Sequence, residues 1–176
     1  GGTGLTSGTT NQFLKFTGST TLASAADNTG KIGQVVYGSY NQAVESSAGG
    51  RVDSGLTASI TPSATSSKIL VMVTQQTDKG NSNSAGNYFQ LILQRQIASG
   101  GYSDLKYVTS LGNYHAGTAS GDKHIGADEY SLHHLDTTNT TSQVDYKTTT
   151  NAETGLITNV DDTGSAHRGE ASMVLM

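Results

Sequence analysis

The chain beyond residue 33 is a series of short runs in which apolar and polar residues alternate or apolar residues stand together. Turn-forming residues separate these runs at intervals of roughly 10 to 20 positions. This spacing predicts β-strands, and no window has the period of an amphipathic helix. We therefore expect an all-β sandwich or barrel. The expected strands are residues 34–37, 56–61, 68–76, 88–97, 102–109, 124–136, 143–148, 156–160 and 171–176.

Two of these runs predict strands that bury one face only. In the run 56–61, apolar residues alternate with hydroxyl side chains that we expect to face water. In the run 88–97, one face is apolar and glutamines occupy the other, which is typical of a solvated surface or a wet interface. The expected core positions are Leu56, Ala58, Ile60, Phe89, Leu91, Leu93 and Ile97.

The run 69–73 is different because it is apolar without interruption. Both faces of this strand must therefore be covered, although an antiparallel sheet commonly leaves one face in water. The second apolar face is therefore expected to be covered in one of two ways. Either it lies at a subunit interface, or the strand is central and lies beneath a long loop.

Residues 1–31 have another texture, rich in Gly, Thr and Ser, with one apolar knot at Phe13-Leu14-Lys15-Phe16. Such a segment cannot bury enough surface by itself to offset the entropy lost on ordering. It is either a flexible linker or one strand of an intertwined stalk in which the apolar knot packs against neighbouring chains. We place the domain boundary between residues 31 and 32.

Composition excludes several classes of protein. Cysteine is absent, so there is no disulfide framework, thiolate metal site or cysteine nucleophile. Charged residues make up 14% of the chain and the net charge is −4, which argues against nucleic acid as a partner. No apolar run approaches the length needed to insert into a membrane. The chain opens on Gly-Gly-Thr-Gly without a signal sequence, and we expect a fragment or a matured piece of a longer polypeptide.

No motif predicts catalysis, a metal or a cofactor. The histidines lack the spacing that places two ligands on one strand face, although a threefold assembly would present one histidine three times near its axis. The neighbouring carboxylates Asp128-Glu129 and Asp161-Asp162 would diverge on strands, whereas glycosidases need two facing carboxyl groups. The run Gly101-Tyr102-Ser103-Asp104-Leu105 lacks the last glycine of a nucleophile elbow.

Two long polar segments, residues 78–87 and 112–127, interrupt the strands. Loops of this length are often functional. The second contains an aromatic residue and two histidines that can stack on a ligand and form hydrogen bonds with it. Our candidate ligand contacts are Tyr114, His115 and His124, with Tyr102 and Tyr107 as alternatives.

The opening GGTGLTSGTTNQFLKFTGSTTLASA resembles the short Gly-Gly-Thr-Gly shaft or collar repeats of bacteriophage tail-fibre proteins, where such a unit precedes a C-terminal head. The Ile60-Thr61-Pro62 turn followed by residues 68–73 is similar to a head domain of virion fibres, notably of cyanobacterial and other marine phages. Thr137 departs from that family, which commonly has proline there, and its members usually continue slightly beyond Met176. The resemblance covers nearly the whole chain. The segments that carry it in the head are residues 31–36, 53–62, 66–73, 89–95, 135–136, 144–146 and 171–176.

This resemblance implies a jelly-roll-like antiparallel β-sandwich head, residues 32–176, that assembles as a homotrimer behind an extended stalk or collar, residues 1–31. Leu70 and Met72 then become candidates for the trimer interface. Phe13, Leu14 and Phe16 become candidates for the interior of the stalk.

The function implied is that of a non-enzymatic virion protein, a tail-fibre head that attaches to the host cell. Its expected partners are further copies of itself, other virion proteins on its N-terminal side, and a surface glycan or outer-membrane component. One alternative is a head fibre or decoration (cement) protein fixed to the capsid. The other, less expected, is a polysaccharide-degrading tailspike-type enzyme, because 176 residues are few for a long groove with convergent carboxylates.

Overall fold

A computed structural model describes residues 13–16, 22–25, 32–46, 50–79, 88–111, 127–152, 156–158 and 169–176 of the chain. The chain divides into two compact units, residues 1–33 and 34–176. In the first unit, β1 (Phe13–Phe16) and β2 (Leu22–Ala25) form an antiparallel pair. The apolar knot is therefore a strand, and its packing inside a multichain stalk stays a prediction.

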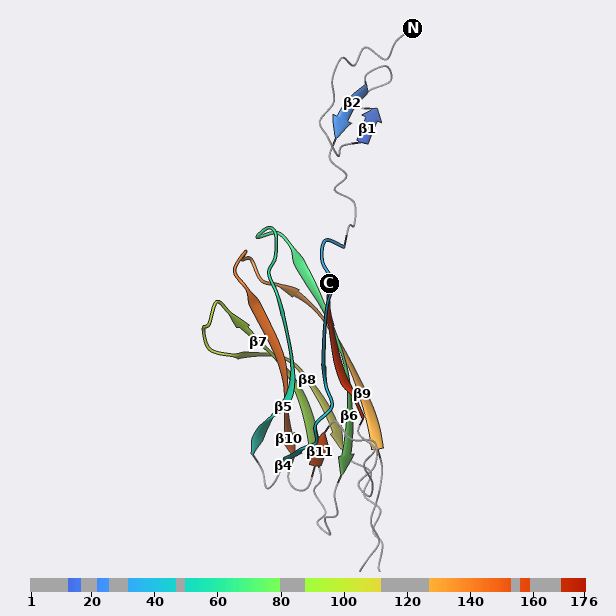
Figure 1. Ribbon diagram of the computed structural model, residues 1–176. Coiled ribbons are helices and arrows are strands. Elements are labelled where there is room, and N and C mark those ends of the chain that lie inside the picture. Colours follow the sequence, from blue (N-terminus) through green and yellow to red (C-terminus); the bar gives the residue numbers. More distant parts are fainter. Residues whose placement is uncertain are drawn as a thin grey trace, which may run out of the picture. The chain divides into compact units, whose positions relative to one another are not determined.

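The second unit is built of β-strands, and the described residues contain no helix, in agreement with the predicted all-β class (Figure 1). Two antiparallel sheets form it. One is four-stranded, in the order β5-β10-β7-β8. The other is six-stranded, in the order β3-β12-β6-β11-β4, with β9 on the opposite edge of β6. The strands are β3 (Val36–Tyr40), β4 (Val44–Ser46), β5 (Arg51–Ile60), β6 (Lys68–Lys79), β7 (Tyr88–Ile97), β8 (Ser103–Leu111), β9 (Ala127–Thr137), β10 (Val144–Ala152), β11 (Leu156–Thr158) and β12 (Ala171–Leu175).

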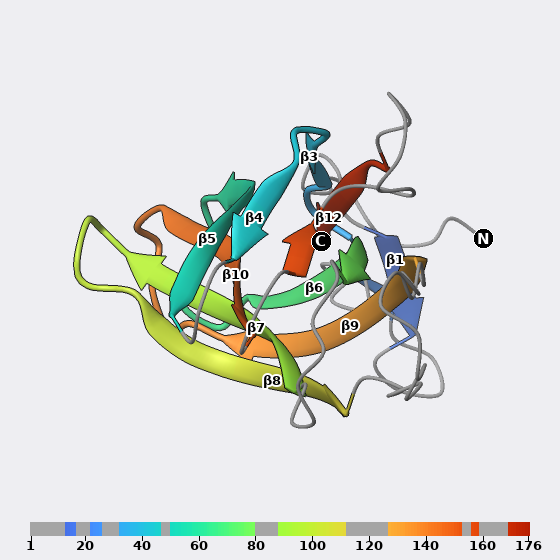
Figure 2. The ribbon, with the colours of Figure 1, turned by 90° about the horizontal axis from the view of Figure 1, so that it is seen from below.

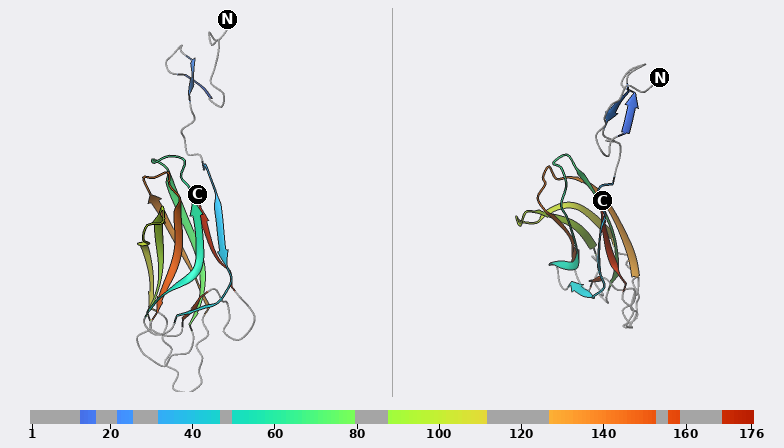
Figure 3. Two further views of the ribbon diagram at one scale, coloured as in Figure 1. Left: turned by 60° about the vertical axis from the view of Figure 1, so that its left-hand side comes forward. Right: turned by 45° about the horizontal axis from the view of Figure 1, so that its top comes forward.

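The long strands pair in a nested order along the chain. The innermost pair is β7 with β8, followed outward by β6 with β9, β5 with β10, and β3 with β12. Successive pairs alternate between the two sheets. The second unit is thus one long antiparallel ribbon rolled into two layers (Figures 2 and 3).

Each expected strand has a counterpart, with differences at the ends. β5 begins at Arg51, before the expected start, and β4 was not expected. β6 continues through Lys79 into the segment expected to be irregular, because β9 and β11 pair with it on both sides whatever its side chains are. The predicted starts and ends at 124–126 and 159–160 lie outside the described residues.

The facing sides of the two sheets enclose one apolar core. The predicted alternation in β5 is confirmed, since Leu56, Ala58 and Ile60 are buried and their neighbours Thr57 and Ser59 are exposed. Leu91 and Leu93 of β7 are buried as well. The buried cluster comprises Leu56, Ala58, Ile60, Ile69, Val71, Val73, Leu93, Leu132, Val144, Tyr146, Ala171, Met173 and Leu175.

Polar side chains join the sheets beside this core. The Thr148 hydroxyl of β10 donates to Gln75 Oε1 of β6 at 2.8 Å. Asp136 of β9 accepts hydrogen bonds from Tyr146 Oη at 2.7 Å and from Arg95 Nη1 at 2.8 Å. Burial and the bond to Asp136 raise the pKa of Tyr146 far above its usual range, so the phenol remains protonated and donates. These bonds hold the two layers in a fixed register.

Candidate functional site

The outer surface of the four-stranded sheet carries a group of aromatic, amide and charged side chains, which we call the tyrosine face. Its members come from four adjacent strands and the turn before β8. They are Arg51, Asp53, Gln94, Tyr102, Asp104, Tyr107 and Lys147.

A β-bulge in β8 decides which side chains reach this surface. Leu93 lies opposite Lys106, whereas the next residue of β7, Gln94, lies opposite Asp104. One extra residue, Leu105, is therefore accommodated in β8, and the alternation of faces is reset there. As a result Asp104 and Tyr107, three positions apart, share one face, and Tyr107 Oη donates a hydrogen bond to Asp104.

Asp104 is the centre of the polar contacts on this face. Its Oδ1 accepts from Gln94 Nε2 at 2.7 Å and from Arg51 Nη1 at 2.9 Å. Its Oδ2 accepts from Arg51 Nη1 at 3.0 Å and from Tyr107 Oη. The hydrogen bonds from Tyr107 and Gln94, followed by the one from Arg51, lower the pKa of Asp104. The carboxylate is thus ionised and accepts two donors on each oxygen.

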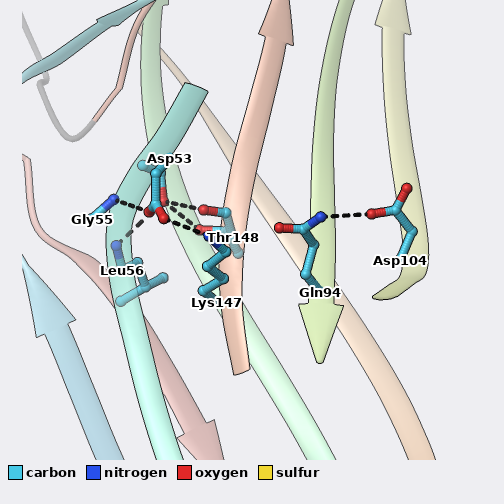
Figure 4. A network of polar contacts seen from close by, with 8 residues as sticks. Asp53, Gly55, Leu56, Gln94, Asp104, Lys147 and Thr148 are labelled. Carbon is cyan, nitrogen blue, oxygen red and sulfur yellow. Dashed lines mark hydrogen bonds and ion pairs between the residues drawn. The ribbon is translucent and has the colours of Figure 1, made fainter. Parts of the chain in front are cut away.

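A second group of contacts joins β5, β10 and Tyr102. Figure 4 shows Asp53 and Lys147 of this group. Lys147 Nζ donates to Asp53 Oδ2 at 2.7 Å and lies 4.3 Å from the centroid of the Tyr102 ring. That position is a cation–π contact. Burial raises the pKa of Tyr102, although the charge of Lys147 opposes the shift. One side of the Tyr102 ring is therefore occupied by a side chain of the protein.

β5 has a bulge at Gly55, close to Asp53. Lys147 lies opposite Thr57 and Thr149 opposite Asp53, so β5 has additional residues between these pairs. Gly55 has φ of 83°, a conformation that glycine adopts at little cost, and its amide donates to Asp53 Oδ1 at 3.0 Å. Ser54 is buried, and its hydroxyl donates to the Thr148 carbonyl at 3.0 Å.

Both tyrosines expose much of their surface although their contacts fix them. Tyr102 is 38% exposed and Tyr107 is 49% exposed. Ile92, opposite Tyr107 on β7, is fully buried although it belongs to the outer side of the sheet. The face therefore offers exposed aromatic surface whose position is fixed by contacts within the protein, an arrangement suited to binding.

The outer surface of the six-stranded sheet has a different character, and we call it the apolar face. Met72 of β6 lies opposite Val174 of β12, which lies opposite Tyr37 of β3. In the adjoining row Leu70 lies opposite Leu135 of β9 and exchanges backbone hydrogen bonds with Met176. Tyr37 and Leu135 are 61% and 58% exposed, and Leu70, Met72, Val174 and Met176 are half-buried.

The predicted site residues of the second unit fall into three groups, whereas Phe13, Leu14 and Phe16 belong to β1 of the first unit. Tyr102 and Tyr107 lie together on the tyrosine face. Leu70 and Met72 lie together on the apolar face, and β6 is a central strand flanked by β9 and β12. Tyr114, His115 and His124 lie outside the described residues.

Sequence reasoning missed most of the charged residues of the tyrosine face. Arg51 and Asp104 are 53 positions apart, and no local pattern connects them. Asp104 had been considered only as part of a nucleophile elbow. The glutamine face of residues 88–97 was a usable signal, because Gln94 is one of the donors to Asp104.

The described part of the chain has no cluster of three or more His, Asp or Glu side chains suited to a metal ion. None of its described segments is a helix able to span a membrane. The chain matches no known family model. It has no significant match among curated proteins.

Proposed function

We propose that the chain is a bacteriophage virion fibre protein whose head attaches to the host cell surface as a homotrimer. The observation that carries the proposal is the contrast between the two outer faces of one head. The apolar face suits contact with further copies, and the tyrosine face suits contact with a ligand. The proposed location is the surface of the virion, with no catalytic activity.

The strand order supports a jelly-roll-like sandwich for this head. Nested antiparallel pairs that alternate between two sheets are what a rolled ribbon of eight strands produces. In this proposal residues 1–31 form the stalk and lead to other virion proteins.

The apolar face supports assembly. A soluble monomer rarely exposes a large continuous apolar patch, and sheet faces of this kind are commonly interfaces. Leu70 and Met72 lie in the middle of it, between Leu135 and Val174. Three identical heads would also present three copies of the tyrosine face, which strengthens attachment by avidity.

Light scattering on the purified chain tests the assembly. We expect a mass near three times 18.2 kDa. The trimer should persist after deletion of residues 1–31 if the apolar face is the main interface. A monomeric full chain would contradict the proposed trimer.

Competition for adsorption tests the attachment. An excess of the purified chain should slow adsorption of the virions that carry it to their host bacteria. Antibody labelling of those virions should mark the tail. Signal over the capsid shell would instead assign the chain to capsid decoration, and unchanged adsorption would contradict a role in attachment.

A further inference from the structure

We propose that the tyrosine face binds a neutral oligosaccharide, with a sugar ring stacked on Tyr107; this inference rests on the proposed attachment function and specifies its ligand. A hexose ring has an apolar face of C–H groups and a rim of hydroxyls. It therefore matches a surface that combines an exposed aromatic ring with planar hydrogen-bonding groups.

Tyr107 is prepared for such stacking. Its hydroxyl donates to Asp104, three residues earlier on the same strand, so the ring lies along the sheet and not away from it. Half of the residue remains exposed. A ring already fixed in place loses little conformational entropy when a ligand binds.

Asp104 is a positioning residue in this scheme. Both of its oxygens already accept two hydrogen bonds, from Gln94, Arg51 and Tyr107. Sugar hydroxyls would be bound by the groups that Asp104 orients. These include the Tyr107 oxygen as an acceptor and N–H groups of Arg51, whose side chain is 41% exposed. Gln94 is buried and holds Asp104 from beneath.

Charge selects against acidic ligands. The tyrosine face and its border contain two cations, Arg51 and Lys147, and three carboxylates, Asp53, Asp104 and Asp145, so their sum is −1. Each cation already forms an ion pair, with Asp104 and Asp53 respectively. A uronate or phosphate would have to displace one of these carboxylates or lie beside them. A neutral glycan avoids this repulsion.

The test is an array of neutral oligosaccharides with acidic, uronate-containing counterparts, followed by saturation-transfer NMR with the best soluble member. We expect binding to neutral members that changes little between low and high salt. Tyr107→Ala should weaken it about tenfold or more, as for an aromatic hot spot. Tyr107→Phe, which keeps the ring, should weaken it by about threefold or less. If Asp104 only positions its neighbours, the loss of sugar affinity in Asp104→Ala should lie between the losses in the two Tyr107 variants.

The matched control is Tyr37→Ala, which removes an exposed tyrosine from the apolar face. Because soluble sugars bind each head singly, assembly does not enter this measurement. Tyr37→Ala should bind as the parent chain does. No binding to any neutral oligosaccharide, a preference for uronates, or equal loss in both alanine variants would overturn the proposal.

Adsorption competition separates this inference from the function on which it rests. If Tyr107→Ala loses affinity for the sugar selectively, the sugar site stands whether or not the parent chain competes with virions. If the parent chain competes but binds no neutral oligosaccharide, the attachment function stands and the sugar site is wrong.

Discussion

The outer faces of the two sheets differ in nearly every respect, although both sheets supply alternate residues to the same core. Across the six-stranded sheet, Met72, Val174 and Tyr37 form an apolar row. Across the four-stranded sheet, Arg51 and Asp104 span from one edge strand to the other. Folding requires only that the inner faces be apolar. The outer faces are therefore where the sequence carries information about partners.

The largest expected effect comes from making the apolar face polar. Leu70→Glu together with Met72→Glu should convert the trimer into monomers and lower the mass in light scattering threefold, because six carboxylates would meet at the interface. Circular dichroism should report an intact β fold. Thr57→Glu on the exposed side of β5 is the matched control and should leave the mass unchanged. Folded double-mutant trimers would show that the apolar face has another role.

Removing a contact that both sheets share should reduce stability without changing either outer face. Asp136→Ala leaves Arg95 and the Tyr146 hydroxyl without their buried partner, and Asp136 is only 4% exposed. We expect a loss of about 3 kcal/mol in the free energy of unfolding, measured in urea. Asp145→Ala, at a half-buried position of β10, should cost much less. If both variants lost the same free energy of unfolding, the contacts of Asp136 would add little to stability.

The bulge in β5 beside Asp53 depends on Gly55. A Cβ at this position would lie 2.4 Å from a carbon of the Tyr40 ring, and its φ of 83° strains any other residue. Gly55→Ala should therefore cost about 1–3 kcal/mol in urea unfolding. Gly101→Ala, where nothing lies within 4 Å, should be nearly neutral. If Gly55→Ala left the free energy of unfolding unchanged, the bulge would be able to accept a side chain at no cost.

The ion pair across the tyrosine face should add little stability. Arg51 is 41% exposed, and exposed pairs are worth about 0.2–1 kcal/mol. A double-mutant cycle with Arg51→Ala and Asp104→Asn should give a coupling energy in that range. It should shrink in high salt. A larger, salt-independent coupling would show that the pair is shielded from solvent.

The smallest effect is in the pH dependence of stability. The pKa of Asp104 is lowered from 3.8 in the folded protein, chiefly by Tyr107 and Gln94. The stability that the ionised Asp104 carboxylate adds to the folded protein is therefore fully present above about pH 4. It is lost as the pH falls through the lowered pKa of the folded state. Asp104→Asn should flatten the acid limb of a plot of unfolding free energy against pH. Identical acid limbs in the parent and the variant would contradict this role.

The strands and the core could be predicted because they follow from local alternation. Leu56, Ala58 and Ile60 are buried as the pattern indicated, and the uninterrupted run at 69–73 is a central strand. The tyrosine face could not be predicted in this way. It depends on the bulge at Leu105, which resets the faces of β8 without a distinctive local pattern. Its ion pairs also join residues distant in sequence.

The nested strand order has a consequence for biosynthesis. β3 emerges from the ribosome long before its partner β12. Tyr37 and Glu170, hydrogen-bonded beside that pair, are 133 positions apart. The innermost hairpin can form first, but the layer containing β6 is complete only when residues 171–175 have been released. Such long-range closure slows folding and exposes unfinished sheet edges to neighbouring chains. A stop codon before β12 should therefore leave an aggregating, protease-sensitive product and not a slightly shorter head.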